Sequence, residues 1–205
     1  MESSDFFIKL KFRDTQLLAI KEIYDKYFAP KIIEEYAGKA FICIWDPAAK
    51  WKPGQKHDKN HNHLGYVVPE CNDDPLWNEF LDILPYMAMS ASLTKMPANA
   101  VMSPHVDRKW RPNAIYFPIS GCTEQCVSKV YDYPLPNSEN SISMNLSDHI
   151  FEYSIVDNAV LTNPHLWHGV ENFSNVERIA FGWNFKPAGH SFEQCKQLLQ
   201  DLGYL

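Results

Sequence analysis

Residues 178–185 read Arg-Ile-Ala-Phe-Gly-Trp-Asn-Phe, and this stretch decides the fold class of the chain. Successive side chains of a β-strand point to opposite faces. One face of this predicted strand would therefore carry large apolar side chains, at positions 179, 181, 183 and 185. The other face carries Arg178 and then only Ala180, Gly182 and Asn184. We predict that helices cover the apolar face and that the opposite face borders an internal space beside a cation. A surface arginine on an edge strand is the alternative, but it would leave the two small residues unexplained.

Short apolar runs separated by turn-rich stretches precede this strand. They span residues 88–94, 100–105, 114–119, 127–131, 149–155 and 159–161, and the last run covers 179–185. Short strands with such even spacing are typical of an antiparallel sandwich or barrel. The composition agrees, because aromatic residues make up 14% and 14 prolines outnumber 8 glycines, which suits a sheet protein with rigid corners better than a helical bundle.

Helices are predicted at both ends of the chain. Apolar residues recur every three or four positions over 15–28, which indicates an amphipathic helix that Pro30 interrupts. The other N-terminal expectations are a short helix over 32–37, a strand over 41–45, a loop over 46–63 and a helix from 74 to about 84. At the C-terminus, Ser191 and Gln194 form a capping box before an apolar stripe, and Gly203 ends the helix. Because no internal repeat or linker is present, residues 1–205 are predicted to form one domain.

The composition argues against several functional classes. The chain carries a formal net charge of −6, which disfavours duplex binding by phosphate neutralisation. No apolar run approaches the roughly 18–20 residues of a membrane span, and the acidic N-terminus lacks the basic start of a signal peptide. The 5 cysteines form no CxxC pair, so a disulfide framework or a zinc knuckle is not expected. We therefore predict a soluble cytoplasmic protein with no membrane or nucleic-acid partner.

The sharpest chemical motif is His105-Val106-Asp107. On a strand, residues two apart project from the same face, so the imidazole and the carboxylate converge. With one more imidazole they would form the two-histidine, one-carboxylate face that binds ferrous iron and leaves three positions open. A hydrogen-bonded pair in a turn is the alternative for these two residues.

Two histidines are candidates for the third ligand. His165 and His168 differ by three positions, so in an extended segment they point to opposite sides and cannot easily join one site. The Gly-Val-x-Asn that follows His168, and its spacing of ten residues to Arg178, favour His168. His165 would then support the site or line the substrate pocket. Arg178 matters because a guanidinium is permanently charged and grips a carboxylate with two parallel hydrogen bonds.

Three stretches together resemble the Fe(II)/2-oxoglutarate-dependent dioxygenases, most closely the prolyl and aspartyl/asparaginyl hydroxylase-like members. They are residues 95–107, residues 111–119, and the segment from Asp157 through His168 to Arg178. The resemblance covers 88–185, roughly half of the chain. It implies a mainly β fold, a double-stranded β-helix (jelly roll) core over 88–185, with a helical support and loop region over 1–87 and a C-terminal helix over 186–205.

The resemblance also implies roles for individual residues. His105, Asp107 and His168 would be the catalytic iron ligands, and Arg178 would hold the distal carboxylate of 2-oxoglutarate. Tyr116 and Thr94 occupy places where relatives often offer the co-substrate a hydroxyl. Such enzymes use O2 to hydroxylate a protein side chain or a small molecule, with succinate and CO2 as co-products. The alternatives are a non-catalytic jelly-roll binding protein that retains the metal and oxo-acid pocket, and a cupin-like metal enzyme, whose extra histidines and glutamate are not found.

The sequence departs from the family at two points. Many relatives carry serine two residues after the arginine, where Ala180 stands here, so part of the co-substrate contact is missing or replaced. The turn before the metal strand usually carries glycine, but here it reads Pro97-Ala98-Asn99. Asparagine tolerates a positive φ, so we expect this turn to survive.

Several further groups of residues are not among the metal or co-substrate ligands that the resemblance implies. The loop histidines His57, His61 and His63 are expected to be solvated, or to belong to a lid, rather than to bind zinc or nickel. The basic run over 108–111 is expected to be a solvated face, with contact to an anionic or peptide substrate as the alternative. Cys122 and Cys126 are expected to be buried or incidental thiols.

Overall fold

The computed structural model describes residues 6–30, 41–45, 64–65, 74–76, 88–107, 113–133, 147–185 and 191–205. In chain order the strands are β1 (Phe7–Lys9), β2 (Phe41–Trp45), β3 (Leu64–Gly65), β4 (Ala88–Met96), β5 (Ala100–His105), β6 (Ala114–Ser120), β7 (Cys126–Tyr131), β8 (His149–Ser154), β9 (Val160–Thr162), β10 (Trp167–Asn172) and β11 (Arg178–Phe185). The helices are α1 (Asp14–Ile23), which continues as the π-helical turn η2 (Tyr24–Phe28), and α4 (Phe192–Asp201).

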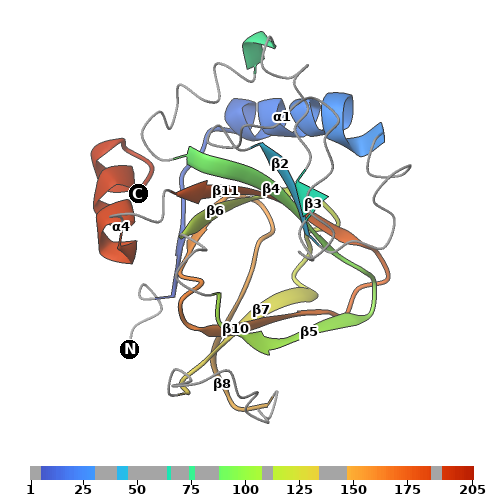
Figure 1. Cartoon of the computed structure of the whole chain (residues 1–205), viewed down its shortest axis with the longest axis vertical. Helices are drawn as coiled ribbons and strands as arrows, with labels where there is room; N and C mark the ends of the chain where they lie inside the picture. The colour runs from blue at the N-terminus through green and yellow to red at the C-terminus, as the bar shows by residue number, and fades with distance from the viewer. Residues whose placement is uncertain are drawn as a thin grey trace.

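The strands form two sheets that face each other (Figure 1). One sheet has seven strands in the order β1-β9-β6-β11-β4-β2-β3, and the other has four in the order β5-β10-β7-β8. Every strand pair is antiparallel except the short parallel pair of β2 with β3. This confirms the predicted fold class, a mainly β jelly roll with helices at its flanks.

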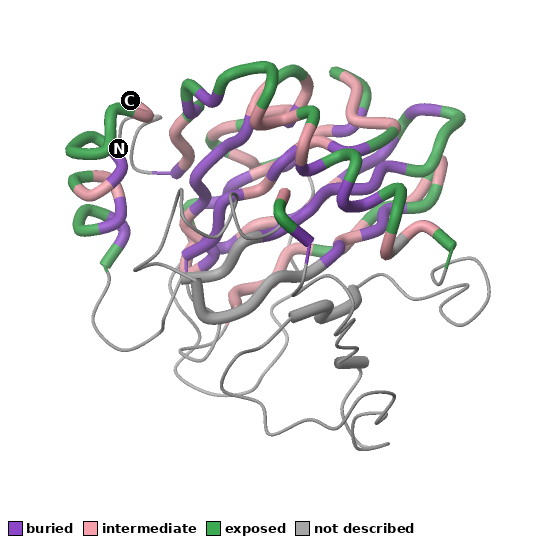
Figure 2. Tube along the Cα trace, turned by 90° about the horizontal axis from the view of Figure 1, so that it is seen from above, coloured by how far each residue is buried: buried purple, intermediate pink, exposed green. Residues whose placement is uncertain are grey.

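Alternation along the strands of the seven-stranded sheet separates the hydrophobic core from an internal cavity. Phe117 and Phe181 are fully buried on the face that α1 and α4 cover, together with Leu93, Ile115 and Leu161. Fully burying a side chain of this size stabilises the fold by about 1.5–3 kcal/mol. Buried segments therefore run along the middle of the strands, as Figure 2 shows. The covering of the apolar face of residues 178–185 by helices is confirmed at Ile179 and Phe181.

The N-terminal strand closes one side between the two sheets. β1 pairs with β9 at one edge of the larger sheet, and its aromatic side chains stack on β8 at one edge of the smaller sheet. Phe7 lies 4.5 Å from the Tyr153 ring at an interplanar angle of 4°, and Phe6 lies 5.7 Å from the Phe151 ring. Aromatic pairs of this kind contribute about 0.5–1.5 kcal/mol beyond their burial.

The predicted elements agree with the structure where it describes them, with three omissions. The amphipathic helix begins at Asp14, the strand over 41–45 is present, and α4 has the predicted capping box at Ser191. Asn99 has a φ of 54°, as the turn requires. The prediction missed β1, β3 and β10, because strands of three and two residues and a segment with histidine, glycine and glutamate lack an apolar alternation. The predicted helix over 32–37, the loop over 46–63 and positions 77–84 lie outside the described residues.

Within the ranges of the chain that the structure describes, no helix is long and apolar enough to cross a membrane.

Candidate metal centre

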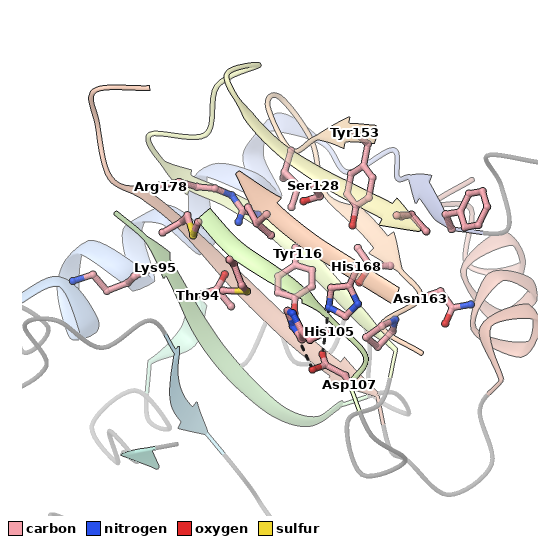
Figure 3. A pocket seen from close by; sticks show the side chains of 18 residues that line it. Thr94, Lys95, His105, Asp107, Tyr116, Ser128, Tyr153, Asn163, His168 and Arg178 are labelled. Atoms are coloured by element: carbon pink, nitrogen blue, oxygen red, sulfur yellow. Dashed lines mark ion pairs between the residues drawn. The ribbon is translucent and has the colours of Figure 1, made fainter. Parts of the chain in front are cut away.

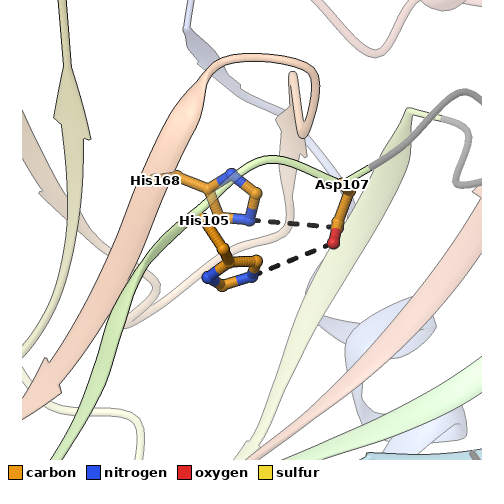
Figure 4. Close-up of side chains that lie close together, drawn as sticks. All are labelled: His105, Asp107 and His168. Atoms are coloured by element: carbon orange, nitrogen blue, oxygen red, sulfur yellow. Dashed lines mark ion pairs between the residues drawn. The ribbon is translucent and has the colours of Figure 1, made fainter. Parts of the chain in front are cut away.

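Two neighbouring strands bring the two predicted histidine ligands together. His105 ends β5, His168 lies in β10, and the two residues are direct partners in the antiparallel register. Asp107 follows β5 by two residues, and its backbone N–H donates to the Pro164 carbonyl at 3.0 Å. Figure 4 shows both imidazoles turned toward the Asp107 carboxylate.

The three side chains surround a space rather than bonding directly to one another. The Nε2 atom of His105 lies 3.8 Å from Oδ1 of Asp107, and the Nε2 atom of His168 lies 3.9 Å from its Oδ2. Both distances exceed the 2.7–3.2 Å or so of an N–H···O hydrogen bond. One ligand atom from each residue lies within 4.8 Å of the other two. The set can therefore converge on a single ion.

Backbone carbonyls fix the orientation of both imidazoles. Nδ1 of His105 lies 2.9 Å from the Ser103 carbonyl oxygen, and Nδ1 of His168 lies 2.8 Å from that of Leu166. A carbonyl oxygen only accepts, so each Nδ1 carries a proton, and in the neutral ring each Nε2 then presents its lone pair. Metal-binding histidines are held in this way by their second nitrogen. The donors present, two imidazole nitrogens and one carboxylate, fit a ferrous ion with open positions.

A cavity of about 110 Å³ extends from these three residues to Arg178. Figure 3 shows Arg178 at one side of the pocket and the three metal-centre side chains at the other. Arg178 is only 6% exposed. In the part of the chain that the structure describes, no carboxylate lies within ion-pair distance of its guanidinium. A buried charge is costly unless it is paired, so this end of the cavity suits an anion.

Hydroxyl groups gather on the cavity wall near Arg178. Thr94 and Tyr116 both line the cavity, as do Ser128 of β7 and Tyr153 of β8 (Figure 3). The Thr94 hydroxyl donates to the Ala180 carbonyl at 3.3 Å. Burial, and then the neighbouring Tyr116, raises the pKa of Tyr153 to about 12, while a hydrogen bond with Ser128 and the charge of Arg178 act the other way. Tyr153 therefore keeps its proton at neutral pH and can donate a hydrogen bond.

Gly169 allows the close approach of β5 and β10. The register of these two strands shifts between His168 and Val170, which marks a β-bulge. A Cβ on Gly169 would lie only 2.8 Å from the Met102 carbonyl oxygen. A larger residue would push the strands apart where they carry the two histidines.

Asn172 ties the far end of β10 to two turns. Its side-chain nitrogen donates to the carbonyls of Met96, Pro97 and Val176, and its oxygen accepts from both the backbone and the hydroxyl of Ser174. Asn172 is fully buried. The asparagine in the Gly-Val-x-Asn string thus has a structural role that fixes the strand of His168.

The structure brings most of the predicted site residues together around one cavity. His105, Asp107 and His168 lie together, and Arg178, Tyr116 and Thr94 line the same cavity. His165 is not part of the cluster; its backbone N–H donates to the Asn163 side chain. The loop histidines at 57, 61 and 63 and the basic run over 108–111 lie outside the described residues. Cys122 and Cys126 are free thiols, and burial raises the pKa of Cys126.

Sequence reasoning missed several residues that line the cavity, among them Phe6, Ser128, Tyr153 and Asn163. Alternation within β7 and β8 could have placed Ser128 and Tyr153 on one face each. Which face turns inward depends on the pairing of these strands with β10, which local patterns do not contain.

Comparisons with known proteins place the fold. No family model matches the sequence, and no match to a curated protein was found. The oxidoreductase of the 2OG-Fe(II) oxygenase family from Burkholderia pseudomallei has a similar structure, with a TM-score of 0.53 at 10% identity over 93% of this chain and 88% of that chain. AviO1 from Streptomyces viridochromogenes Tue57 gives 0.52 at 12% identity over 91% and 92%. SnoK, a non-heme alpha-ketoglutarate-dependent carbocyclase from nogalamycin biosynthesis, gives 0.51 at 13% identity over 91% and 84%. At such low identity, these similarities show a shared fold.

Proposed function

We propose that this protein is an Fe(II)- and 2-oxoglutarate-dependent oxygenase. The observation that carries the proposal is the convergence of His105, Asp107 and His168 within 4.8 Å, at one end of a cavity that contains a buried arginine. Two-histidine, one-carboxylate donor sets are typical of non-heme ferrous oxygenases. Two of the similar structures, the Burkholderia oxidoreductase and SnoK, are described as enzymes of this chemistry.

Each residue of the cavity has a distinct task in this proposal. His105, Asp107 and His168 would hold the metal, and the Arg178 guanidinium would bind the distal carboxylate of 2-oxoglutarate through two parallel hydrogen bonds. With iron and 2-oxoglutarate bound, O2 would be the oxidant: the metal would activate it, and the oxo-acid would supply two electrons as it loses CO2, with succinate and CO2 as co-products. The protein contributes ligand orientation through the Ser103 and Leu166 carbonyls.

Other hydroxyl groups in the cavity are available for the co-substrate contact that Ala180 does not make. Ser128 and Tyr153 reach the cavity from the opposite sheet, close enough to Arg178 for its charge to affect the pKa of Tyr153. We propose that these hydroxyls, with Tyr116 and Thr94, bind the co-substrate in place of the serine that many relatives carry two residues after the arginine. Tyr153 suits this role because it stays protonated and can donate to a carboxylate.

We propose that the substrate is either a small molecule or a side chain of a peptide or protein. We also propose that its hydroxylation takes place in the cytoplasm. Phe6, Val130 and Pro164 border the cavity and offer apolar surface to such a substrate. The prolyl or asparaginyl hydroxylase subtype remains part of this proposal.

Anaerobic titration and aerobic turnover test the function together. Fe(II) and 2-oxoglutarate added without O2 should produce a weak visible charge-transfer band, and admission of O2 should release succinate, with slow uncoupled release even without substrate. His105→Ala should lose both signals. A wild-type protein that gives neither signal, and binds iron no better than His105→Ala, would contradict the assignment.

The same titration separates the second candidate, a binding protein that keeps the pocket. Such a protein would bind the metal and 2-oxoglutarate and show the absorption band. It would release no succinate under O2 across a panel of amino acids, peptides and small metabolites.

A further inference from the structure

We propose that Asn163 is a positioning residue that aligns two of the three metal ligands through a single turn. The inference rests on the proposed metal centre, because it concerns how that centre is held. Asn163 follows β9 and precedes Pro164 in the segment that leads to β10. Its side chain is one of those that line the cavity (Figure 3).

The asparagine side chain fixes the turn itself. Its Oδ1 accepts from the backbone N–H of His165 at 3.2 Å, which is the bond of an Asx turn. The backbone N–H of Asn163 donates to the Phe6 carbonyl at 3.0 Å, which anchors the start of the turn to the N-terminal segment. Pro164 restricts the backbone of Asn163 to extended conformations. The turn is therefore held from both sides.

The carbonyls of this turn hold two metal ligands that belong to different strand ends. The Pro164 carbonyl accepts from the backbone N–H of Asp107 at 3.0 Å. The Leu166 carbonyl, two residues later, accepts from Nδ1 of His168 at 2.8 Å. Loss of the Asx bond would free both carbonyls to shift, and with them the Asp107 backbone and the His168 ring. Constellations of this kind work only when held to within about 0.5 Å.

A purely structural role for Asn163 predicts a different result. Asn158, at the other end of β9, makes a comparable local bond, in which its Oδ1 accepts from the Ala159 backbone N–H at 2.8 Å. This bond does not involve a metal ligand. Asn158→Ala is therefore a matched control that removes an asparagine side-chain bond next to the same strand.

Co(II) is the probe, because its visible spectrum reports ligand geometry and its binding needs no turnover. Asn163→Ala should bind Co(II) about 10–100-fold more weakly than wild type and should show a changed d–d spectrum. Asn163→Gln, which keeps the amide but moves its oxygen by one methylene, should behave like Asn163→Ala. It provides the same test if the alanine variant fails to fold. Asn163→Asp keeps an accepting oxygen at the same position and should restore the wild-type spectrum. Asn158→Ala should lower thermal stability and leave both Co(II) readouts unchanged.

Three outcomes overturn the inference and are distinguishable. If wild type, Asn163→Ala and Asn163→Gln bind Co(II) with equal affinity and identical spectra, Asn163 does not position the ligands, while the metal centre stands. If Asn158→Ala reproduces the loss seen for Asn163→Ala, the effect is general loosening of the β9 flanks. A wild-type protein that binds no Co(II) would overturn the metal centre of the proposed function, and the role of Asn163 with it.

Discussion

At the scale of single residues, the chemistry of the cavity is concentrated in a few side chains whose partners are fixed. The sequence favours His168 over His165, because only one of the two can face His105 on an extended segment and because Gly-Val-x-Asn and the spacing to Arg178 follow His168. In the structure His168 is the direct strand partner of His105. Arg178 was likewise predictable, since the small residues after it on its strand indicated an internal space. Ser128 and Tyr153 were not, because their inward direction is set by pairing with β10, which lies far away in the sequence.

Substitution of Arg178 tests the anion end of the cavity. Hydrogen bonds to charged groups contribute about 1.5–3 kcal/mol, so Arg178→Gln should weaken 2-oxoglutarate binding by about 10–100-fold. Binding of Mn(II) alone should stay within about twofold, because the guanidinium is not a metal ligand. Arg178→Lys keeps the charge without the two-pronged geometry and should fall between the two. Calorimetric titration of each ligand gives the comparison, and equal losses for metal and oxo-acid would indicate misfolding instead.

At the scale of elements, the β5–β10 pair and the turn before β10 place the side chains of the candidate metal centre. β10 was missed as a strand because it carries Gly169 and Glu171 within a short, partly polar segment. It is a strand because both of its edges are paired, with β5 on one side and β7 on the other. The Lys129–Glu171 ion pair at 2.8 Å also links it to β7. Long-range pairing of this kind overrides a weak local preference.

Gly169→Ala tests the close approach of these strands. The added Cβ would meet the Met102 carbonyl at 2.8 Å, so the backbone must shift. We expect a loss of about 1–3 kcal/mol in the free energy of unfolding, together with weaker binding of Co(II). Val101→Thr is the control, since Val101 lies on β5, the strand that Gly169 approaches, but is 51% exposed. Unchanged Co(II) affinity in a destabilised Gly169→Ala protein would show that the bulge serves stability alone.

The contacts of Asp74 with two residues of η2 give an element-scale prediction about pH. Asp74 accepts from Lys26 at 2.6 Å and from the Tyr27 hydroxyl at 2.5 Å, and these bonds lower its pKa from 3.8 to about 2. A carboxyl whose pKa is lower in the folded state stabilises the fold above its unfolded pKa and loses that contribution as pH falls. The free energy of unfolding should therefore drop between about pH 4 and pH 2, and the drop should be smaller in Asp74→Asn.

Urea unfolding at a series of pH values from 2 to 7 measures this difference. Glu193→Gln is the control, because its carboxylate is 69% exposed on α4. It should follow the wild-type pH profile. Parallel profiles for wild type and Asp74→Asn would show that the cluster around Asp74 does not contribute to acid stability.

At the scale of the whole molecule, the periodicity of apolar residues was enough to predict an antiparallel β fold. It was also enough to predict which side of the sheet faces the core and which faces the cavity. Leu93 and Thr94 are neighbours that fall on opposite sides of the same sheet, as alternation requires. The closure of the fold by β1 could not be predicted, because three residues carry too little pattern and gain their stability from β9 and from the aromatic rings of β8. His105 and Asp107 could be proposed as a pair because their spacing is local in the sequence, whereas the choice of His168 rested on the residues that follow it and on its spacing to Arg178.

The direct pairing of His105 with His168 makes a bound ion a cross-link between two strands. β5 lies at one edge of the four-stranded sheet, where β10 is its one partner among the described strands, and the ion would link its end to β10. A ligand that binds only the folded state at 100 times its dissociation constant stabilises that state by about 2.7 kcal/mol. Saturating Mn(II) should therefore raise the melting temperature and slow amide hydrogen exchange most strongly in β5. EDTA should reverse both effects, and His105→Ala should show neither. Equal protection in β5 and in the remote helix α4 would mean that the ion stabilises the molecule as a whole and does not stabilise the edge strand β5 in particular.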